Sequence, residues 1–272
     1  MWGDLALYAV FGALAGLVSG LFGVGGGIII VPFLAWLFPR QGFPESLVML
    51  AAVATSLATI VVTSISAVIT HHRLGAVRWE VVARLAPGIL LGALLGTLIA
   101  QRLPVAVFKL VFALFLFFVA VGLYRRSNAA ASPRLRPRWG WFLGAGSVIG
   151  TVSSILGIGG GTLSVPFLLR CGHPIHSAVA ISNACGFPLA LAGTLSYVWL
   201  GWKHSEVPVP SLGYVYLPAF LGIIATSVPF APVGARLAHR LPTRVLKRAF
   251  ALVLGVVGSR LLYQSLRLLI AG

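Results

Sequence analysis

Two glycine-rich stretches, one in each half of the chain, constrain the fold more than any other feature. Gly23 to Gly27 precedes the segment Val31-Pro32-Phe33-Leu34, and Gly157 to Gly161 precedes Val165-Pro166-Phe167-Leu168, at a constant offset of 134 residues in a chain of 272. Glycines weaken a helix, because each costs roughly 1 kcal/mol relative to alanine. Two such breaks at equivalent positions predict a matched pair of interrupted membrane segments.

The composition indicates an integral membrane protein with several spans. Hydrophobic residues make up 59% of the chain and charged residues 9%, whereas a soluble domain is about 25% charged. The formal charge of +16 lies mostly in short loops between apolar runs. We therefore interpret it as a determinant of membrane orientation rather than as a nucleic-acid-binding surface. The first apolar run contains Asp4 and has no basic leader, which favours a span over a cleavable signal.

The apolar runs predict ten helices, five in each half. The first five are expected at residues 4–22, 25–38, 45–70, 81–101 and 105–124, and the second five at 139–157, 159–171, 175–200, 211–236 and 243–270. A basic linker, 125–138, separates the halves. We therefore expect an all-α polytopic membrane protein built from two five-helix repeats, residues 1–124 and 139–272, with a glycine-broken segment in each.

The distribution of basic residues favours inverted repeats. If all ten helices cross the membrane and the N-terminus lies outside, 14 of the 20 lysines and arginines fall on the cytoplasmic side and 6 outside. If the short second element of each half is re-entrant, the two sides hold 9 and 11, and no bias remains. The positive-inside rule thus predicts a multi-pass membrane protein with both termini outside and the linker in the cytoplasm.

The glycine stretches are the first candidates for a binding site. An unwound segment that leads into a helix presents free backbone N–H groups at the positive end of the helix dipole, which attracts anions without a charged side chain. This predicts substrate contacts at Gly25, Gly26, Gly27, Gly159, Gly160 and Gly161. The alternative is that these glycines only allow helices to pack closely.

Four polar side chains in the long third element of each half are candidates to complete the site. Thr55 and Ser56 lie in the first half, and Ser182 and Asn183 in the second. They offer hydroxyl and amide donors to an anion, although serine and threonine also bond to their own helix backbone in lipid. Asn183 is the more informative of the four, because an amide in an apolar run is costly without a partner.

The remaining chemistry-bearing residues exclude several classes of function. The four acidic residues lie near helix ends or in loops, which argues against a carboxylate proton relay or sodium site. No lysine follows either glycine run as a phosphate-binding loop requires, and no H-x-x-E-H or G-x-S-x-G context appears. The two cysteines lack metal-ligand spacing. We therefore expect no enzyme activity, cofactor or metal. Cys171 and Cys185 are expected to be packing residues. Arg260 lies inside a long apolar stretch, where it either faces a water-filled cavity or extends to the outer interface.

The ordered motifs resemble the TauE/SafE sulfite-exporter family of bacterial membrane proteins. They are the two G-[VI]-G-G-G-x(4)-P-F-L segments, Ala52 to Ser56 with its echo at Ala178 to Ser182, and Gly234 to Pro242. The resemblance implies outward transport of sulfite or of an organosulfonate such as sulfoacetate across the bacterial inner membrane. This sequence has Ile181-Ser182-Asn183 where the family often has a second Thr-Ser pair.

From the residues and the resemblance together, our leading hypothesis is a secondary transporter that exports a small sulfur anion by alternating access. Transport of another small anion or organic acid, a channel, and a non-transporting scaffold are the alternatives. The expected partners are the anion and the lipid bilayer but no nucleic acid, and a homodimer is left open.

Overall fold

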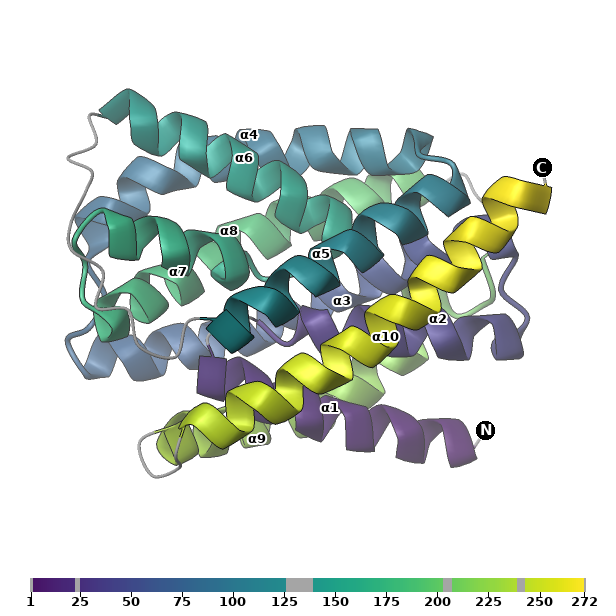
Figure 1. Cartoon of the computed structure of the whole chain (residues 1–272), viewed down its shortest axis with the longest axis horizontal. Coiled ribbons are helices and arrows are strands. Elements are labelled where there is room, and N and C mark those ends of the chain that lie inside the picture. The colour runs from purple at the N-terminus through teal and green to yellow at the C-terminus, as the bar shows by residue number, and fades with distance from the viewer. Residues whose placement is uncertain (1, 23–24, 126–138, 203–206, 239–242, 272) are drawn as a thin grey trace.

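The computed structural model describes residues 2–22, 25–125, 139–202, 207–238 and 243–271. Nearly all of these residues are helical (Figure 1). The first half contains α1 (Trp2–Phe22), α2 (Gly27–Leu37), the 3₁₀ turn η1 (Phe38–Gln41), α3 (Glu45–Arg73), α4 (Trp79–Arg102) and α5 (Val105–Arg125). The second half contains α6 (Trp139–Leu156), α7 (Gly161–Arg170), α8 (Ile175–Gly201), strands β1 (Ser211–Leu212) and β2 (Val215–Tyr216), α9 (Leu217–Ala238) and α10 (Thr243–Ala271).

The all-α membrane architecture expected from the apolar runs is confirmed. Six helices, α3, α4, α5, α6, α8 and α9, contain stretches long and apolar enough to cross a membrane. The helix predicted over 211–236 is wrong at its start, because residues 211–216 form a short antiparallel hairpin and α9 begins at Leu217. The predicted linker lies outside the described residues, except for Arg125 at the end of α5.

The second helix of each half is short. α2 has 11 residues and α7 has 10, so each is about 15–16 Å long, roughly half of the ~30 Å hydrocarbon core. Both start later than predicted, at 27 and 161 rather than at 25 and 159, because Gly26 and Gly160 have a positive φ that cannot continue an α-helix. Both are therefore half-helices that begin at a glycine.

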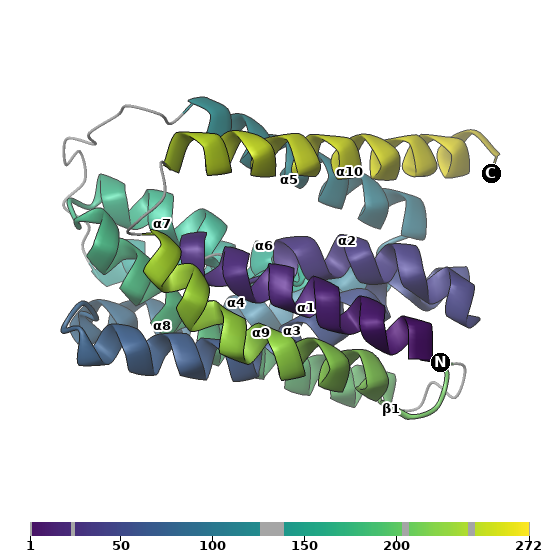
Figure 2. The ribbon, with the colours of Figure 1, turned by 90° about the horizontal axis from the view of Figure 1, so that it is seen from below.

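The long helices α3 and α8 form the centre of the bundle. α3 is buried continuously from Leu47 to Ile60, and α8 from Ala180 to Gly186, and the two helices pack on each other. Figure 2 shows α5 and α10 side by side in a layer that covers one face of the other helices. The half-helices lie against the central pair, since α2 contacts α3 and α7 contacts α8.

Helix contacts occur in matched pairs between the two halves. α1 packs on α9 as α6 packs on α4, and α3 contacts α9 as α8 contacts α4. The first, third and fourth helices of the first half (α1, α3 and α4) thus correspond to those of the second half (α6, α8 and α9). Each of these contacts between the halves has a counterpart when corresponding helices are exchanged. The beginning of α1 and the end of α10 lie at the same end of the molecule (Figures 1 and 2).

Candidate functional site

The two glycine stretches adopt the same backbone conformation. Gly26 is the N-cap of α2 and Gly160 is the N-cap of α7, and both have φ 72° and ψ −21°. The carbonyl oxygen of each glycine accepts hydrogen bonds from the backbone N–H groups three and four residues later. A left-handed residue at this position favours glycine, because any Cβ crowds the following carbonyl group.

The two stretches also meet in the interior, although about half of the chain separates them. A side chain at Gly25 would place its Cβ 2.8 Å from the Cα atom of Gly159. A side chain at Gly27 would collide with the carbonyl oxygen of Gly157 and lie 2.9 Å from the Ser56 hydroxyl oxygen. The structure therefore brings the predicted glycines into direct backbone contact, with no room for larger residues at Gly25 or Gly27.

The helix starts at this meeting point are buried, and they leave backbone donors without helical partners. Gly159, Gly160 and Gly161 are all buried. The first N–H groups of a helix have no acceptor within the helix, and within the described residues no hydrogen bond is found from the N–H groups of Gly161 or Thr162. The positive end of the α7 dipole thus lies among buried residues, where it acts more strongly on a negative charge than it would in bulk water.

Ser56 and Thr55 on α3 take different partners. The Ser56 hydroxyl donates to the carbonyl oxygen of Gly157 at 2.7 Å, so this side chain lies at the glycine contact. Thr55 instead accepts a hydrogen bond of 3.0 Å from the backbone N–H of Tyr216 in the hairpin. Both side chains are fully buried. Of the predicted pair, the structure therefore places Ser56 at the glycines and Thr55 against β2.

Ser182 and Asn183 on α8 form hydrogen bonds with different elements. The hydroxyl oxygens of Ser182 and Ser164 are hydrogen-bonded at 2.7 Å, and the Ser164 hydroxyl also lies 2.8 Å from the carbonyl oxygen of Gly160. Ser182 is thereby connected to the start of α7 through Ser164. Asn183 donates its side-chain amide to the carbonyl oxygen of Val179 in its own helix, at 3.1 Å.

Two buried hydroxyl groups that sequence reasoning missed lie at or near the start of α7. The Ser153 and Thr162 side-chain oxygens are buried and have no hydrogen-bond partner in the part of the chain that the structure describes. A Cβ at Gly160 would lie 3.8 Å from the Ser153 oxygen. A sequence signal for Ser153 exists, because the 134-residue offset that relates the glycine motifs also relates Ser19 to Ser153. An unpaired buried hydroxyl is costly, which suggests a ligand-facing role.

The described residues contain no group of three or more histidines, cysteines or carboxylates placed to hold a metal ion. The candidate residues offer backbone N–H groups, hydroxyls and the Asn183 amide. Backbone N–H groups held at the start of a helix favour a negative ligand over a cation.

The comparisons with known proteins agree with one another and indicate a family of membrane transporters. Residues 8–261 match the family described as "Sulfite exporter TauE/SafE". A "Probable membrane transporter protein" of Haemophilus influenzae is 40% identical over 259 residues, covering 94% of this chain and 97% of that protein. A probable membrane transporter protein of Methanocaldococcus jannaschii is 26% identical, with 93% and 94% coverage. The Bacillus subtilis protein YunE, also named a probable membrane transporter, is 24% identical, with 97% and 99% coverage. No solved structure matches the chain.

Proposed function

Because the chain belongs to the sulfite exporter TauE/SafE family, we propose that it exports sulfite or a small organosulfonate anion across the bacterial inner membrane. It does so as a secondary transporter that works by alternating access. The observation that carries this proposal is the contact between the two glycine stretches, at Gly25 and Gly159, beside helix caps at Gly26 and Gly160 that share one left-handed conformation. Two half-helix starts that lie close together would provide an anion site without a charged side chain.

In the proposed site the backbone N–H groups of Gly25–Gly27 and Gly159–Gly161 bind the oxygen atoms of the anion. In this conformation Ser56, Ser182, Thr55 and Asn183 bond to protein atoms. The hydroxyls of Ser153 and Thr162, which have no partner among the described residues, add two donors for the anion. The contact between Gly25 and Gly159 leaves no space for a ligand. The anion therefore enters when the two half-helices separate, and the closed contact returns after release.

The proposed motion rests on an inverted-repeat architecture of residues 1–124 and 139–272. The matched helix contacts, the two half-helices and the shared end for the first and last helices support it. With the basic linker in the cytoplasm, both termini face the periplasm. In such a protein the two repeats exchange conformations, so that the site opens first to one side and then to the other.

The test of this proposal is counterflow in proteoliposomes. Vesicles are loaded with sulfite, and exchange is measured against external sulfite, sulfate, thiosulfate, sulfoacetate and acetate. Saturable exchange that is restricted to sulfite or sulfonates supports a carrier for small sulfur anions. Equal exchange of acetate points to a general small-anion transporter, and flux that does not saturate points to a channel. Either result would remove the proposed substrate class or mechanism.

A further inference from the structure

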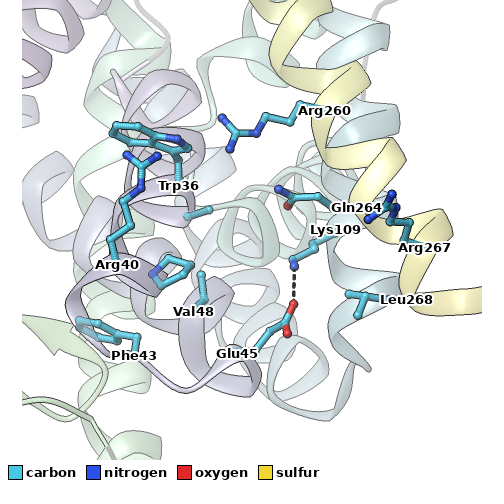
Figure 3. A pocket seen from close by; sticks show the side chains of 12 residues that line it. Trp36, Arg40, Phe43, Glu45, Val48, Lys109, Arg260, Gln264, Arg267 and Leu268 are labelled. Carbon is cyan, nitrogen blue, oxygen red and sulfur yellow. Dashed lines mark hydrogen bonds and ion pairs between the residues drawn. The ribbon is translucent and has the colours of Figure 1, made fainter. Parts of the chain in front are cut away.

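A basic pocket lies at the end of the molecule where α2 and η1 end and α10 approaches its C-terminal end (Figure 3). Its volume is about 460 Å³. The charged side chains that line it are Arg40, Lys109, Arg260, Arg267 and Glu45. Lys109 donates to Glu45 at 3.0 Å, so three arginines of this lining have no carboxylate of the same lining left to pair with. The pocket therefore carries an excess of positive charge.

The arginines that line the pocket come from two elements, Arg40 from η1 and Arg260 and Arg267 from α10, and the Arg267 guanidinium lies 4.8 Å from the ring centroid of Tyr263. The Arg40 guanidinium lies over the Trp36 indole ring, 3.8 Å from its centroid. Arg260 extends from α10 toward the same indole, with Gln264 beside it (Figure 3). Arg260, Gln264 and Arg267 are spaced at i, i+4 and i+7, which puts them on one face of α10. Guanidinium groups so arranged present several N–H donors to an oxyanion.

An apolar pocket of about 280 Å³ continues from the basic one. The two share Ala35, Trp36, Arg260 and Gln264. The rest of the second lining is hydrophobic: Phe11, Ile28, Ile29, Pro32, Phe33, Leu254, Val257 and Leu261. It follows α2 and α10 from the basic end toward the start of α2. The two pockets together form one groove with a cationic end and an apolar arm.

The apolar arm identifies the class of occupant. A small hydrated anion such as sulfite loses its water in such an arm and gains no hydrogen bond, which is unfavourable. A hydrocarbon chain fits it. Phe11, Ile29 and Val257 of this lining are partly exposed, so the groove is open at the surface of a membrane protein, where it is accessible to molecules of the bilayer.

We propose that this groove is a binding site for an anionic phospholipid. The phosphate group is bound by Arg40 and Arg260, with Gln264 and Arg267 at the rim, and one acyl chain fills the apolar arm between α2 and α10. In this proposal Arg260 binds a lipid headgroup. This corresponds to the second of the two alternatives for Arg260, extension to the outer interface, rather than to a water-filled cavity. The bound lipid bridges the α5–α10 layer and the half-helix α2. This inference does not depend on which anion the protein transports.

The experiment measures thermal stability of the purified full-length protein in neutral detergent during lipid titrations. Phosphatidylglycerol and phosphatidylcholine with identical acyl chains are compared. We expect phosphatidylglycerol to raise Tm, and to reach half of its full effect at a concentration about tenfold lower than phosphatidylcholine needs. The reason is that the arginines favour a net negative headgroup. This preference should shrink as salt is added. Inorganic phosphate and glycerol phosphate, which have no acyl chain, should give no shift at the same concentrations.

Two variants are compared. One is the double variant Arg40→Gln and Arg260→Gln, and the other is Arg102→Gln, a control outside the lining of the pocket. The double variant should lose the preference for phosphatidylglycerol, whereas Arg102→Gln should keep it. Equal shifts by the two lipids in the wild-type protein would overturn the proposal, as would a preference that survives in the double variant. A full shift with inorganic phosphate alone would make the pocket a small-anion site instead. If the double variant does not fold, the lipid and salt comparisons on the wild-type protein still decide.

Discussion

The Ser56 hydroxyl on α3 donates a hydrogen bond of 2.7 Å to the carbonyl oxygen of Gly157. This bond joins the central helix of the first half to the glycine stretch of the second. Neither residue has access to solvent, since Ser56 is 0% exposed and Gly157 is buried. The oxygen of Gly157 is also the atom that excludes a side chain at Gly27. The Ser56 hydroxyl thus lies where the two glycine stretches meet and bonds to one of them.

Replacement of Ser56 by alanine should lower Tm. The carbonyl oxygen of Gly157 would lose its side-chain donor in a buried position, at a cost of about 1–3 kcal/mol. Thr63→Ala is the matched control, because the Thr63 hydroxyl bonds only to carbonyls of its own helix, which already accept helical bonds. A Tm for Ser56→Ala equal to that of Thr63→Ala would contradict the structural role of this bond.

Substitution by alanine should prevent folding at Gly27 but should be compatible with folding at Gly160. At Gly27 the added methyl collides with the Gly157 carbonyl group, so Gly27→Ala should not give a folded protein. At Gly160 the nearest atom is the Leu189 Cδ1 at 3.5 Å, and the positive φ costs about 1–2 kcal/mol. Gly160→Ala should therefore fold, with a reduced Tm, and should lose sulfite counterflow because its methyl group narrows the proposed site beside Ser153.

Size-exclusion chromatography and thermal unfolding of both variants test the packing part of this prediction. Counterflow by Gly160→Ala tests the site. Wild-type transport by a folded Gly160→Ala protein would remove the start of α7 from the proposed site, while leaving the packing account of Gly27 intact.

Ser153→Ala should reduce transport without reducing stability. The Ser153 hydroxyl has no partner among the described residues, so its removal eliminates no protein hydrogen bond. If it donates to the anion, its loss should raise KM by roughly 10- to 150-fold, because a hydrogen bond to a charged group is worth about 1.5–3 kcal/mol. The neighbouring Ser154 bonds to the Gly150 carbonyl of its own helix, which makes Ser154→Ala the control. An unchanged KM in Ser153→Ala would exclude this role.

The stability of the protein should fall in mild acid, partly because of His173. Burial in the loop after α7 lowers the pKa of its imidazole, and the positive charge of Arg78 lowers it further. In the unfolded chain the group takes up its proton near pH 6.5, before the folded protein does. Stability from His173 is therefore present above about pH 6.5 and is lost as the pH falls toward the lower folded value. His173→Gln should have the same Tm as wild type at pH 8 and a smaller loss of Tm at pH 5. Parallel pH profiles would contradict this.

Both termini should be periplasmic. Alkaline phosphatase, which folds only outside the cytoplasm, should be active when fused after Gly272 and inactive when fused after residue 130. The opposite pattern would reverse the orientation inferred from the basic loops. Activity at both positions would exclude an odd number of crossings between them, and with it the inverted-repeat proposal.

Most of the helices were predictable from local sequence. Apolar runs and the prolines and glycines between them place α3, α5, α8 and α10 within a few residues of their observed bounds, because hydrophobicity and backbone breaks are properties of neighbouring residues. The segment 211–216 was not predicted, since its hairpin depends on remote partners. Tyr216 donates its N–H to Thr55 on α3, and Gly213 lies against the backbone of α8 near Val198.

The candidate site was only partly predictable, for the same reason. The paired motifs identified the glycines, and an isolated polar residue in an apolar run identified Asn183. The directions of side chains could not be derived from spacing. Asn183 bonds to its own helix, while Ser153, which has no distinctive local context, lies close to Gly160.

The sequence by itself determined that the chain is a helical membrane protein of the TauE/SafE family with two glycine-broken segments, because hydropathy, glycine positions and motif order are all written along the chain. Only the tertiary structure decided that Gly25 meets Gly159, that Ser56 bonds to Gly157, and that Arg260 shares a pocket with Arg40. Such contacts join residues that are far apart in the sequence, and they follow from how whole helices pack rather than from the preferences of any one segment.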